Sequence, residues 1–296
     1  MIKFRDTFKD ICILSSDTEI LKDYFSFGFK VMGKHIFPQT DENLKFYKGK
    51  KYIYECRTDE DCYKFYEFYR NNFEKNTIQI YYNALFDKAM IDMLMLKVLN
   101  KSKNILKSMR FISHLICCDG INYWHLKKLI LENKLNFNDL ENEKDAKQLF
   151  YMEMSTLKGV DTTQILNKFN IIDAAVAGNN VFADNNKLRP CTSLKKFQFG
   201  FMGEQLKFDF SKYETIADII KDNNLETFIK YSLYDLDSLE QFVINFCIPV
   251  FENRFKIMEN HNINILKNYR MLFSESNTHL IHYLNKMTVN KSIKCD

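Results

Sequence analysis

The chain has 296 residues, enough for one large domain or two smaller ones. Apolar residues make up 46% of it and charged residues 27%, a composition that excludes a disordered or fibrous chain. The 42 Lys and Arg residues against 38 Asp and Glu give a formal net charge of +4, so any surface that binds nucleic acid would have to be local.

The eight cysteines include no Cys-x-x-Cys pair, and their spacing predicts neither a zinc site nor a disulfide framework. The first residues lack the apolar core of a secretory signal, and no run approaches the roughly 18 apolar residues of a membrane span. We therefore expect a protein of a reducing, cytoplasmic compartment, without a membrane partner.

Strand and helix patterns alternate over the first hundred residues. Apolar residues alternate with polar ones, or run together briefly, in the expected strands, and recur every three or four positions in the expected helices. The expected elements are a strand over 11–16, an extended segment over 24–32, a helix over 60–74, a strand over 78–82 and a helix over 87–99. Helices interleaved with strands favour an α/β sheet.

The middle of the chain is less regular. Residues 108–118 are expected to form another strand, and residues 119–157 are interpreted as an insertion. Asn and Glu dominate 133–148, which predicts a solvent-exposed excursion within that insertion. The phenylalanines near residue 200 alternate with lysines, a pattern more typical of a half-buried strand than of a surface that stacks bases.

The second half of the chain is expected to end in two helices. The segments in order are strand-like 159–166, turn-rich 178–190, and helices over 214–222 and about 225–258, the latter kinked at Pro249. We expect one domain over 1–245 and a helical C-terminal extension over 246–296. The predicted fold is thus an α/β fold, a mixed sheet flanked by helices, with a helical insertion and a helical extension.

Four acids fall where these elements could bring them together. Asp17 and Glu19 are two apart at the end of the first strand, so their side chains point to one face. Asp87 opens the helix after the 78–82 strand, and Asp235 lies four residues past Tyr231 on a helix. Converging carboxylates would repel one another unless cations were bound. Two hard divalent ions about 3.5–4 Å apart can support an in-line phosphoryl displacement.

The polar residues form three short motifs: Asp17-x-Glu19, Asn83-x-x-x-Asp87 and Tyr231-x-x-x-Asp235. In this order they resemble the three motifs of the tyrosine-type DEDD 3′→5′ exonucleases. The phrase over 82–87 looks most like the second motif of proofreading domains in bacteriophage and protein-primed family B DNA polymerases. This resemblance covers residues 10 to about 245.

The resemblance implies a ribonuclease-H-like exonuclease fold and its chemistry. In that family the four acids hold two Mg²⁺ or Mn²⁺ ions, which here assigns the ligands to Asp17, Glu19, Asp87 and Asp235. The family tyrosine positions the attacking water, a role that falls on Tyr231. A core aromatic on an apolar helix face is the alternative for this tyrosine, since other apolar residues share its spacing.

Contacts with single-stranded DNA are implied by the same resemblance. Lys207 begins a Lys-x-x-hydrophobic motif whose lysine contacts the region of the scissile phosphate, and Asn83 matches the position that holds the primer end. Thr18 and Phe86, inside the first two motifs, complete the expected contacts. The Ser/Thr-Leu motif of the family falls either at 193–194 or near 161–162. Lys195, Lys196 and Lys207 are equally compatible with solvated surface charges.

Two functions of different classes follow. The first is a metal-dependent 3′→5′ exonuclease on single-stranded DNA, for which proofreading is one candidate role; RNA as a substrate is left open. The second is a non-catalytic or weakly active nucleic-acid-binding subunit of a split viral DNA polymerase, with a polymerase or replication protein as its partner. The residues after 245 are too few for palm, fingers and thumb, so we expect no polymerase part in this sequence.

Overall fold

The computed structural model describes residues 12–32, 41–73, 77–82, 84–117, 120–156, 170–174 and 194–247, together with residues 256, 260 and 262. Its described strands form one sheet in the order β3-β4-β2-β1-β5-β6. The strands are β1 (Cys12–Leu21), β2 (Tyr24–Val31), β3 (Leu44–Tyr47), β4 (Lys51–Cys56), β5 (Thr77–Tyr81) and β6 (Asn170–Asp173).

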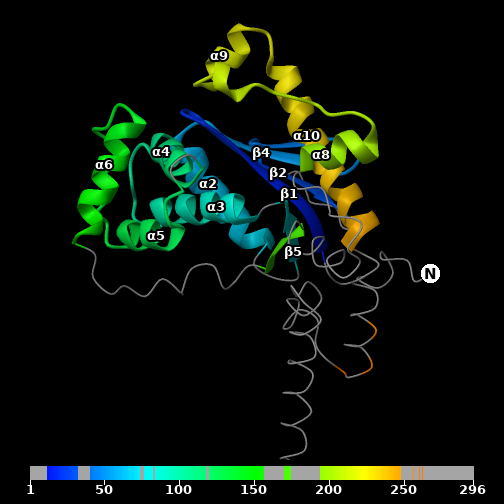
Figure 1. Ribbon diagram of the computed structural model, residues 1–296, viewed down its shortest axis with the longest axis horizontal. Helices are drawn as coiled ribbons and strands as arrows, with labels where there is room; N and C mark the ends of the chain where they lie inside the picture. Colours follow the sequence, from blue (N-terminus) through cyan, green and yellow to red (C-terminus); the bar gives the residue numbers. More distant parts are fainter. Residues whose placement is uncertain are drawn as a thin grey trace, which may run out of the picture.

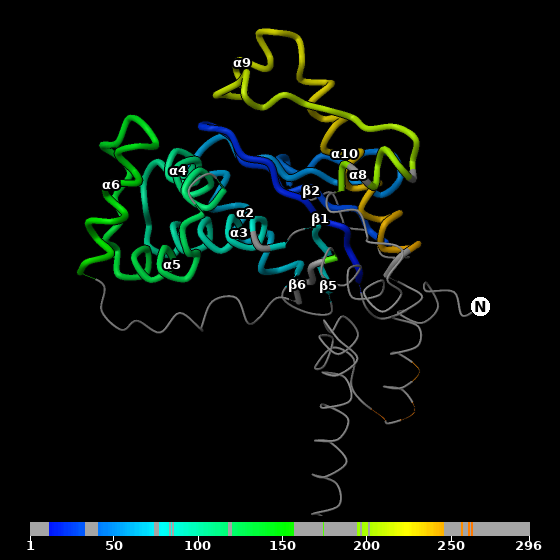
Figure 2. Tube along the Cα trace, in the orientation of Figure 1, coloured from blue at the N-terminus to red at the C-terminus, as the bar shows by residue number. Residues whose placement is uncertain are grey.

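The sheet is mixed, and β1 lies at the change of direction. β1 lies between β2 and β5 (Figure 2). It is antiparallel to β2, as are β2 and β3 to β4, whereas β1, β5 and β6 run parallel to one another. The parallel strands are separated in sequence by helices, because parallel neighbours need a long crossover connection. The prediction of an α/β fold with a mixed sheet flanked by helices is therefore confirmed.

Helices cover both faces of this sheet (Figure 1). One face packs on α2 (Asp59–Phe73), α3 (Ala84–Leu99) and α4 (Ile105–Cys117), with α5 (Tyr123–Leu131) and α6 (Glu143–Met154) outside them. The other face packs on α10 (Leu225–Phe242), flanked by α8 (Leu194–Phe197) and α9 (Ile216–Lys221).

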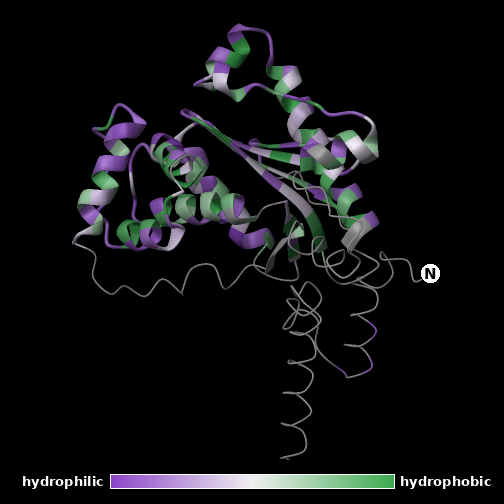
Figure 3. Cartoon of the chain, viewed as in Figure 1, coloured by the Kyte–Doolittle hydropathy of each residue, from purple (hydrophilic) through white to green (hydrophobic). Residues whose placement is uncertain are grey.

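Helix α3 is buried between the sheet and other helices. α3 is apolar around most of its circumference and is largely green in Figure 3, because the sheet lies on one side of it and α4 and α5 on the other. An aromatic cluster joins β2 to α2: the rings of Phe25 and Phe27 lie 5.3 and 5.8 Å from that of Phe65. Such ring pairs add roughly 0.5–1.5 kcal/mol each beyond the area they bury.

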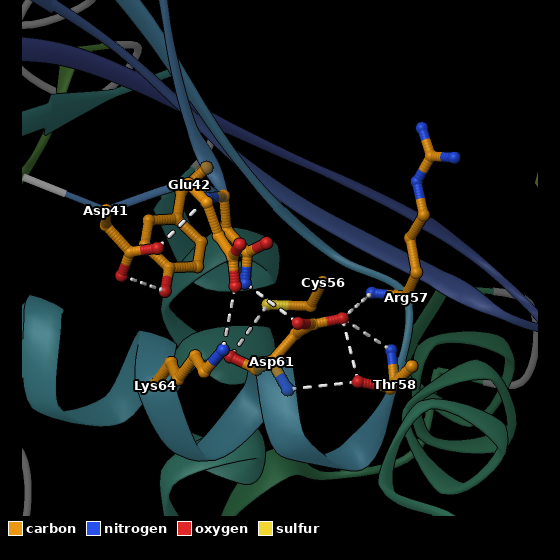
Figure 4. Close-up of polar contacts among 9 residues, drawn as sticks. Asp41, Glu42, Cys56, Arg57, Thr58, Asp61 and Lys64 are labelled. Atoms are coloured by element: carbon orange, nitrogen blue, oxygen red, sulfur yellow. Dashed lines mark hydrogen bonds and ion pairs between the residues drawn. The ribbon is translucent and has the colours of Figure 1, made fainter. Parts of the chain in front are cut away.

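The turn from β4 into α2 is fixed by a capping box. The Asp61 carboxylate accepts the backbone N–H of Arg57 and of Thr58, both at 2.9 Å, and the Thr58 hydroxyl oxygen accepts the N–H of Asp61 (Figure 4). Lys64, one turn further on, donates to Glu42 across the same end of the helix. Reciprocal capping satisfies N–H groups that a helix start leaves free, so α2 begins at a defined residue against the sheet.

Several predicted elements are confirmed with small shifts of their ends. The segments expected over 24–32, 60–74, 78–82 and 87–99 are β2, α2, β5 and α3. The helix expected over 214–222 is α9, and that expected over about 225–258 begins as α10, which ends at Phe242 and is followed by a π-helix over Val243–Cys247. The first strand is longer than predicted: it does not end before the acids but runs through them to Leu21, because β2 pairs with it over that whole length.

The strand predicted over 108–118 is wrong, because this segment lies in helix α4. The buried residues Ile105, Met109 and Ile112 recur at steps of four and three, a helical period that a window starting at 108 cuts short. Cys117 is consequently exposed at the end of the helix, not buried in a strand.

The solvent-exposed excursion predicted over 133–148 is also only partly right. Leu135 and Phe137 are buried in the main core, and α6 begins at Glu143 with Ala146 and Phe150 turned inward. Apolar residues spaced widely among Asn and Glu are enough to anchor the segment. The insertion proposed for 119–157 thus contains two helices, α5 and α6.

The phenylalanine-rich segment near residue 200 is helical and not the half-buried strand expected. α8, whose last residue Phe197 is buried, leads into a π-helix over Gln198–Met202, in which Phe199 is 71% exposed. The predictions for 159–166, 178–190, Pro249 and nearly all of 246–296 lie outside the described residues. Within the described part of the chain, no helix is both long and apolar enough to cross a membrane.

Candidate metal centre

Asp17 and Glu19 lie in the middle of the sheet on the face that α10 covers. The two-residue period of β1 puts them on the same side as Ser15, whose hydroxyl donates to the backbone oxygen of Leu236 on α10 at 3.1 Å. Both carboxylates are half-buried. The prediction that these two acids share a face is confirmed, although they sit within a strand and not at its end.

A glycine lets α10 come close to the sheet at this point. Gly28 of β2 pairs with Asp17, and a Cβ atom added to Gly28 would lie 3.4 Å from the Leu236 side chain. The close approach carries Asp235, the residue before Leu236, towards the two acids of β1. One carboxylate oxygen from each of Asp17, Glu19 and Asp235 lies within 4.8 Å of the others, so these three residues could hold a metal ion.

Asp87 stands beside these three acids, in the first turn of α3. Its Oδ1 accepts the Thr18 backbone N–H at 3.0 Å and the Thr18 hydroxyl at 2.7 Å. Ser15 is the last β1 residue that pairs with β5, so Thr18 lies past the end of that pairing and its N–H can be taken by a side chain. Asp87 is close enough for its charge to raise the pKa of both Asp17 and Glu19.

The electrostatics of the cluster are those of like charges held together. Burial raises the pKa of Asp17 well above its usual value, and the neighbouring carboxylates raise it further. The pKa of Glu19 is raised for the same two reasons, while Lys195 and Ser232 lower it. Burial raises the pKa of Asp235 as well. An all-oxygen set of this kind fits a hard divalent cation, whose charge would offset the repulsion.

Tyr231 lies at the edge of this cluster, one helical turn before Asp235. Burial and then the charges of Glu19, Asp235 and Asp17 raise the pKa of its hydroxyl, which forms a hydrogen bond with Asp235. Its ring lies 5.7 Å from that of Phe210 and is buried. The ring of Tyr231 therefore packs as a core aromatic, and its hydroxyl reaches the acids.

Two residues outside the three acidic motifs also reach the site. Gln198, fully buried, donates its amide to the Oδ1 of Asp235 at 2.6 Å and to the hydroxyl of Ser238 at 3.0 Å. Lys195, one helical turn earlier, is exposed, and its charge lowers the pKa of Asp235 and of Glu19. Their spacing of three residues was a usable signal only once the segment was known to be helical.

The residues predicted to bind single-stranded DNA are spread more widely. Thr18 is buried and bonded to Asp87, Phe86 packs partly buried against the main core, and Lys207 is exposed on the segment before α9. Asn83 lies outside the described residues. The charge of Lys195 reaches the acids, since it lowers the pKa of Glu19 and of Asp235.

A cleft lies beyond the carboxyl end of β1, where the α4–α6 helices face the segment that leads into α9. It is lined by Lys22, Lys107, Arg110, Phe111, Glu141, Glu143 and Glu214. Lys22 is three residues past Glu19, a separation of roughly 10 Å along a strand. The cleft carries as many acidic as basic side chains, so its lining does not by itself indicate an anion site.

Comparisons of the chain with protein-family models, with curated proteins and with solved structures give no match. The function therefore has to be argued from the arrangement of the residues.

Proposed function

We propose that this protein is a metal-dependent 3′→5′ exonuclease that hydrolyses phosphodiester bonds at the 3′ end of single-stranded DNA. The observation that carries the proposal is the meeting of three carboxylates, Asp17, Glu19 and Asp235, within 4.8 Å of one another. They come from one strand and one helix at opposite ends of the chain. Repulsion at this distance has a cost that a structural role does not require.

The side chains around the acids support this chemistry. Asp17, Glu19, Asp87 and Asp235 would hold two Mg²⁺ or Mn²⁺ ions, which when bound can activate a water and stabilise the leaving oxygen. The Tyr231 hydroxyl, which lies among the same acids, would orient the attacking water. Lys195, exposed beside Glu19 and Asp235, would bind the phosphate that is being cleaved.

The sheet gives independent support. Three antiparallel strands, β4, β2 and β1, are followed by β5 and β6 parallel to β1, and the acids lie on β1 and at the start of α3, directly after β5. This arrangement is compatible with a ribonuclease-H-like fold, the fold that the three sequence motifs imply. In an α/β sheet, sites gather at the carboxyl ends of the strands, where α3 begins here.

Substitution of single acids tests the proposal. We expect Asp17→Asn and Asp235→Asn each to lower Mg²⁺-dependent, EDTA-sensitive degradation of a single-stranded oligonucleotide by about 100-fold or more, because several kcal/mol of charge stabilisation are lost. Oligonucleotides labelled at the 3′ and at the 5′ end, as DNA and as RNA, give the direction of attack and the preferred sugar.

The matched control is Glu226→Gln, which removes an exposed acid from the first turn of the same helix as Asp235. This variant should degrade DNA at the wild-type rate. Wild-type protein that releases no nucleotide with Mg²⁺ or Mn²⁺ would contradict the proposal, as would Asp235→Asn protein with unchanged activity.

A further inference from the structure

Gln198 has an unusual environment for a side chain amide. It is fully buried, at the first residue of the π-helix, and it contacts Asp235 and Ser238 on α10. Both contacts are made by its Nε2 group, which therefore uses both of its N–H donors on the same helix. A buried amide without such partners costs roughly 1–3 kcal/mol, so the pairing with Asp235 is strongly favoured.

The backbone that carries Gln198 is firmly packed. The preceding residue, Phe197, is also fully buried, and its ring lies edge-on to that of Phe242 at 5.3 Å. The hydroxyl of Ser238 in turn donates to the backbone oxygen of Tyr234 at 2.6 Å. The ring packing of Phe197 therefore holds the backbone at Gln198. The Nε2 group is held by Ser238, whose own hydroxyl is fixed by its bond to Tyr234.

The hydrogen bond from Gln198 goes to one defined oxygen of a candidate metal ligand. Gln198 binds the Oδ1 of Asp235, and Tyr231 forms a hydrogen bond with the same carboxylate. With these partners in place the Asp235 carboxylate cannot rotate freely about its last bond. Metal-binding carboxylates are commonly held in this way by outer hydrogen bonds, and loss of such a partner typically weakens metal binding about 10–100-fold.

We propose that Gln198 is a positioning residue that orients Asp235 towards the cation shared with Asp17 and Glu19. This role rests on the proposed function, since it requires the acidic cluster to bind a metal. The segment from Leu194 to Gln198 would then help to orient a metal ligand of the site. Short π-helical turns such as the one that begins at Gln198 often occur at functional sites.

The test is the affinity of the full-length protein for Mn²⁺, measured by calorimetry and by electron paramagnetic resonance without nucleic acid. Gln198→Met keeps the length of the side chain and removes the amide, and we expect it to weaken Mn²⁺ binding about 10–100-fold. Melting temperature and circular dichroism of the same samples check that the variant is folded.

Gln79→Met is the matched control. Gln79 is another fully buried glutamine; it accepts the hydroxyls of Tyr69 and Tyr81 at 2.6 and 2.8 Å on the opposite face of the sheet. This substitution should lower stability and leave the affinity for Mn²⁺ unchanged. If both variants lost affinity equally, general loosening of the fold would explain the loss and the positioning role would be overturned.

The remaining outcomes separate the two proposals. Wild-type protein that binds no Mn²⁺ would remove the metal centre itself, and with it the proposed function. Wild-type binding together with equal binding by Gln198→Met would overturn the role of Gln198 and leave the nuclease proposal intact. If Gln198→Met does not fold, Gln198→Asn, which keeps the amide but is one methylene too short to reach Asp235, takes its place with the same expected loss.

Discussion

Asp92 and Lys127 form an ion pair that is shielded from water inside the α3–α5 interface. The side chain of Asp92 is 0% exposed and that of Lys127 1%, with 3.1 Å between Nζ and Oδ2. The hydroxyl of Tyr123 donates to the same carboxylate. Burial raises the pKa of Asp92, and the hydrogen bond from Tyr123 and the charge of Lys127 oppose that rise. Its partners Lys127 and Tyr123 both lie on α5, which carries none of the four acids, so we assign the pair a structural role.

Removing one partner should be costly, because a charge would stay buried alone. We expect Asp92→Ala to lower the free energy of unfolding by roughly 3–5 kcal/mol, measured by urea denaturation. The double variant Asp92→Leu with Lys127→Met should recover most of that loss, since neither charge remains. A single variant as stable as the wild type would show that water reaches the pair.

Among single residues, some members of the site could be predicted from the sequence and others could not. Asp17, Glu19 and Asp235 could be predicted because they belong to short motifs with a fixed spacing. Gln198 could not, since its importance arises only from its packing against α10. Lys195 was a candidate, but nothing in the sequence distinguished it from Lys196 and Lys207. Nor does anything in the sequence pair Asp92 with Lys127, which lie on different helices.

β1 serves a different purpose on each of its faces. One face carries Asp17 and Glu19 under α10, and the other packs into the main core with α2 and α3. Gly28, directly beside Asp17, lies under Leu236 of α10, where there is room for a single Cβ atom but not for a larger side chain. The position of Asp235 therefore depends on an element that carries no acid of the site.

A branched side chain at Gly28 should separate the acids without removing any of them. We expect Gly28→Val to push Leu236 outward, to destabilise the protein by about 1–3 kcal/mol, and to weaken Mn²⁺ binding. Gly28→Ala is the control: its single Cβ would lie at ordinary contact distance from a flexible leucine end, so it should bind Mn²⁺ nearly as wild type does. Equal affinity in the valine variant would contradict this dependence on helix position.

Elements were predictable where periodicity was long and uninterrupted. α2 and α3 were recognised from their spacing, whereas α4 was mistaken for a strand because its apolar residues are dense and the window omitted Ile105 and Leu106. The pairing of β6 beside β5 was not predictable, since four residues carry too little pattern to distinguish a strand from a turn.

The whole molecule has a small net charge of +4, yet it concentrates negative charge at one internal point. The pKa values of Asp17, Glu19 and Asp235 are raised in the folded state. The folded state therefore binds more protons than the unfolded state at pH values between the ordinary and the raised pKa values. Stability from these groups is full at low pH and is lost as pH rises through the raised values.

The three acids should accordingly lower the melting temperature of the chelated protein at pH 8 relative to pH 5. Asp17→Asn should raise the melting temperature of the chelated protein at pH 8 by a few degrees, since about 1 kcal/mol corresponds to roughly 2–4 °C in a chain of this size. Added Mg²⁺ should stabilise the wild type and have a smaller effect on the variant. Scanning calorimetry at both pH values, with and without EDTA, measures this; a variant that melts below wild type at pH 8 would contradict it.

The hydrogen bond between Ser15 and Leu236 joins residues 221 positions apart, and the acidic cluster has the same long reach. During synthesis on the ribosome, Asp17 and Glu19 emerge early, while Asp235 follows only after most of the polypeptide has been made. Prematurely terminated products would therefore carry the first two acids without the third, and the acidic cluster stays incomplete until translation has passed α10.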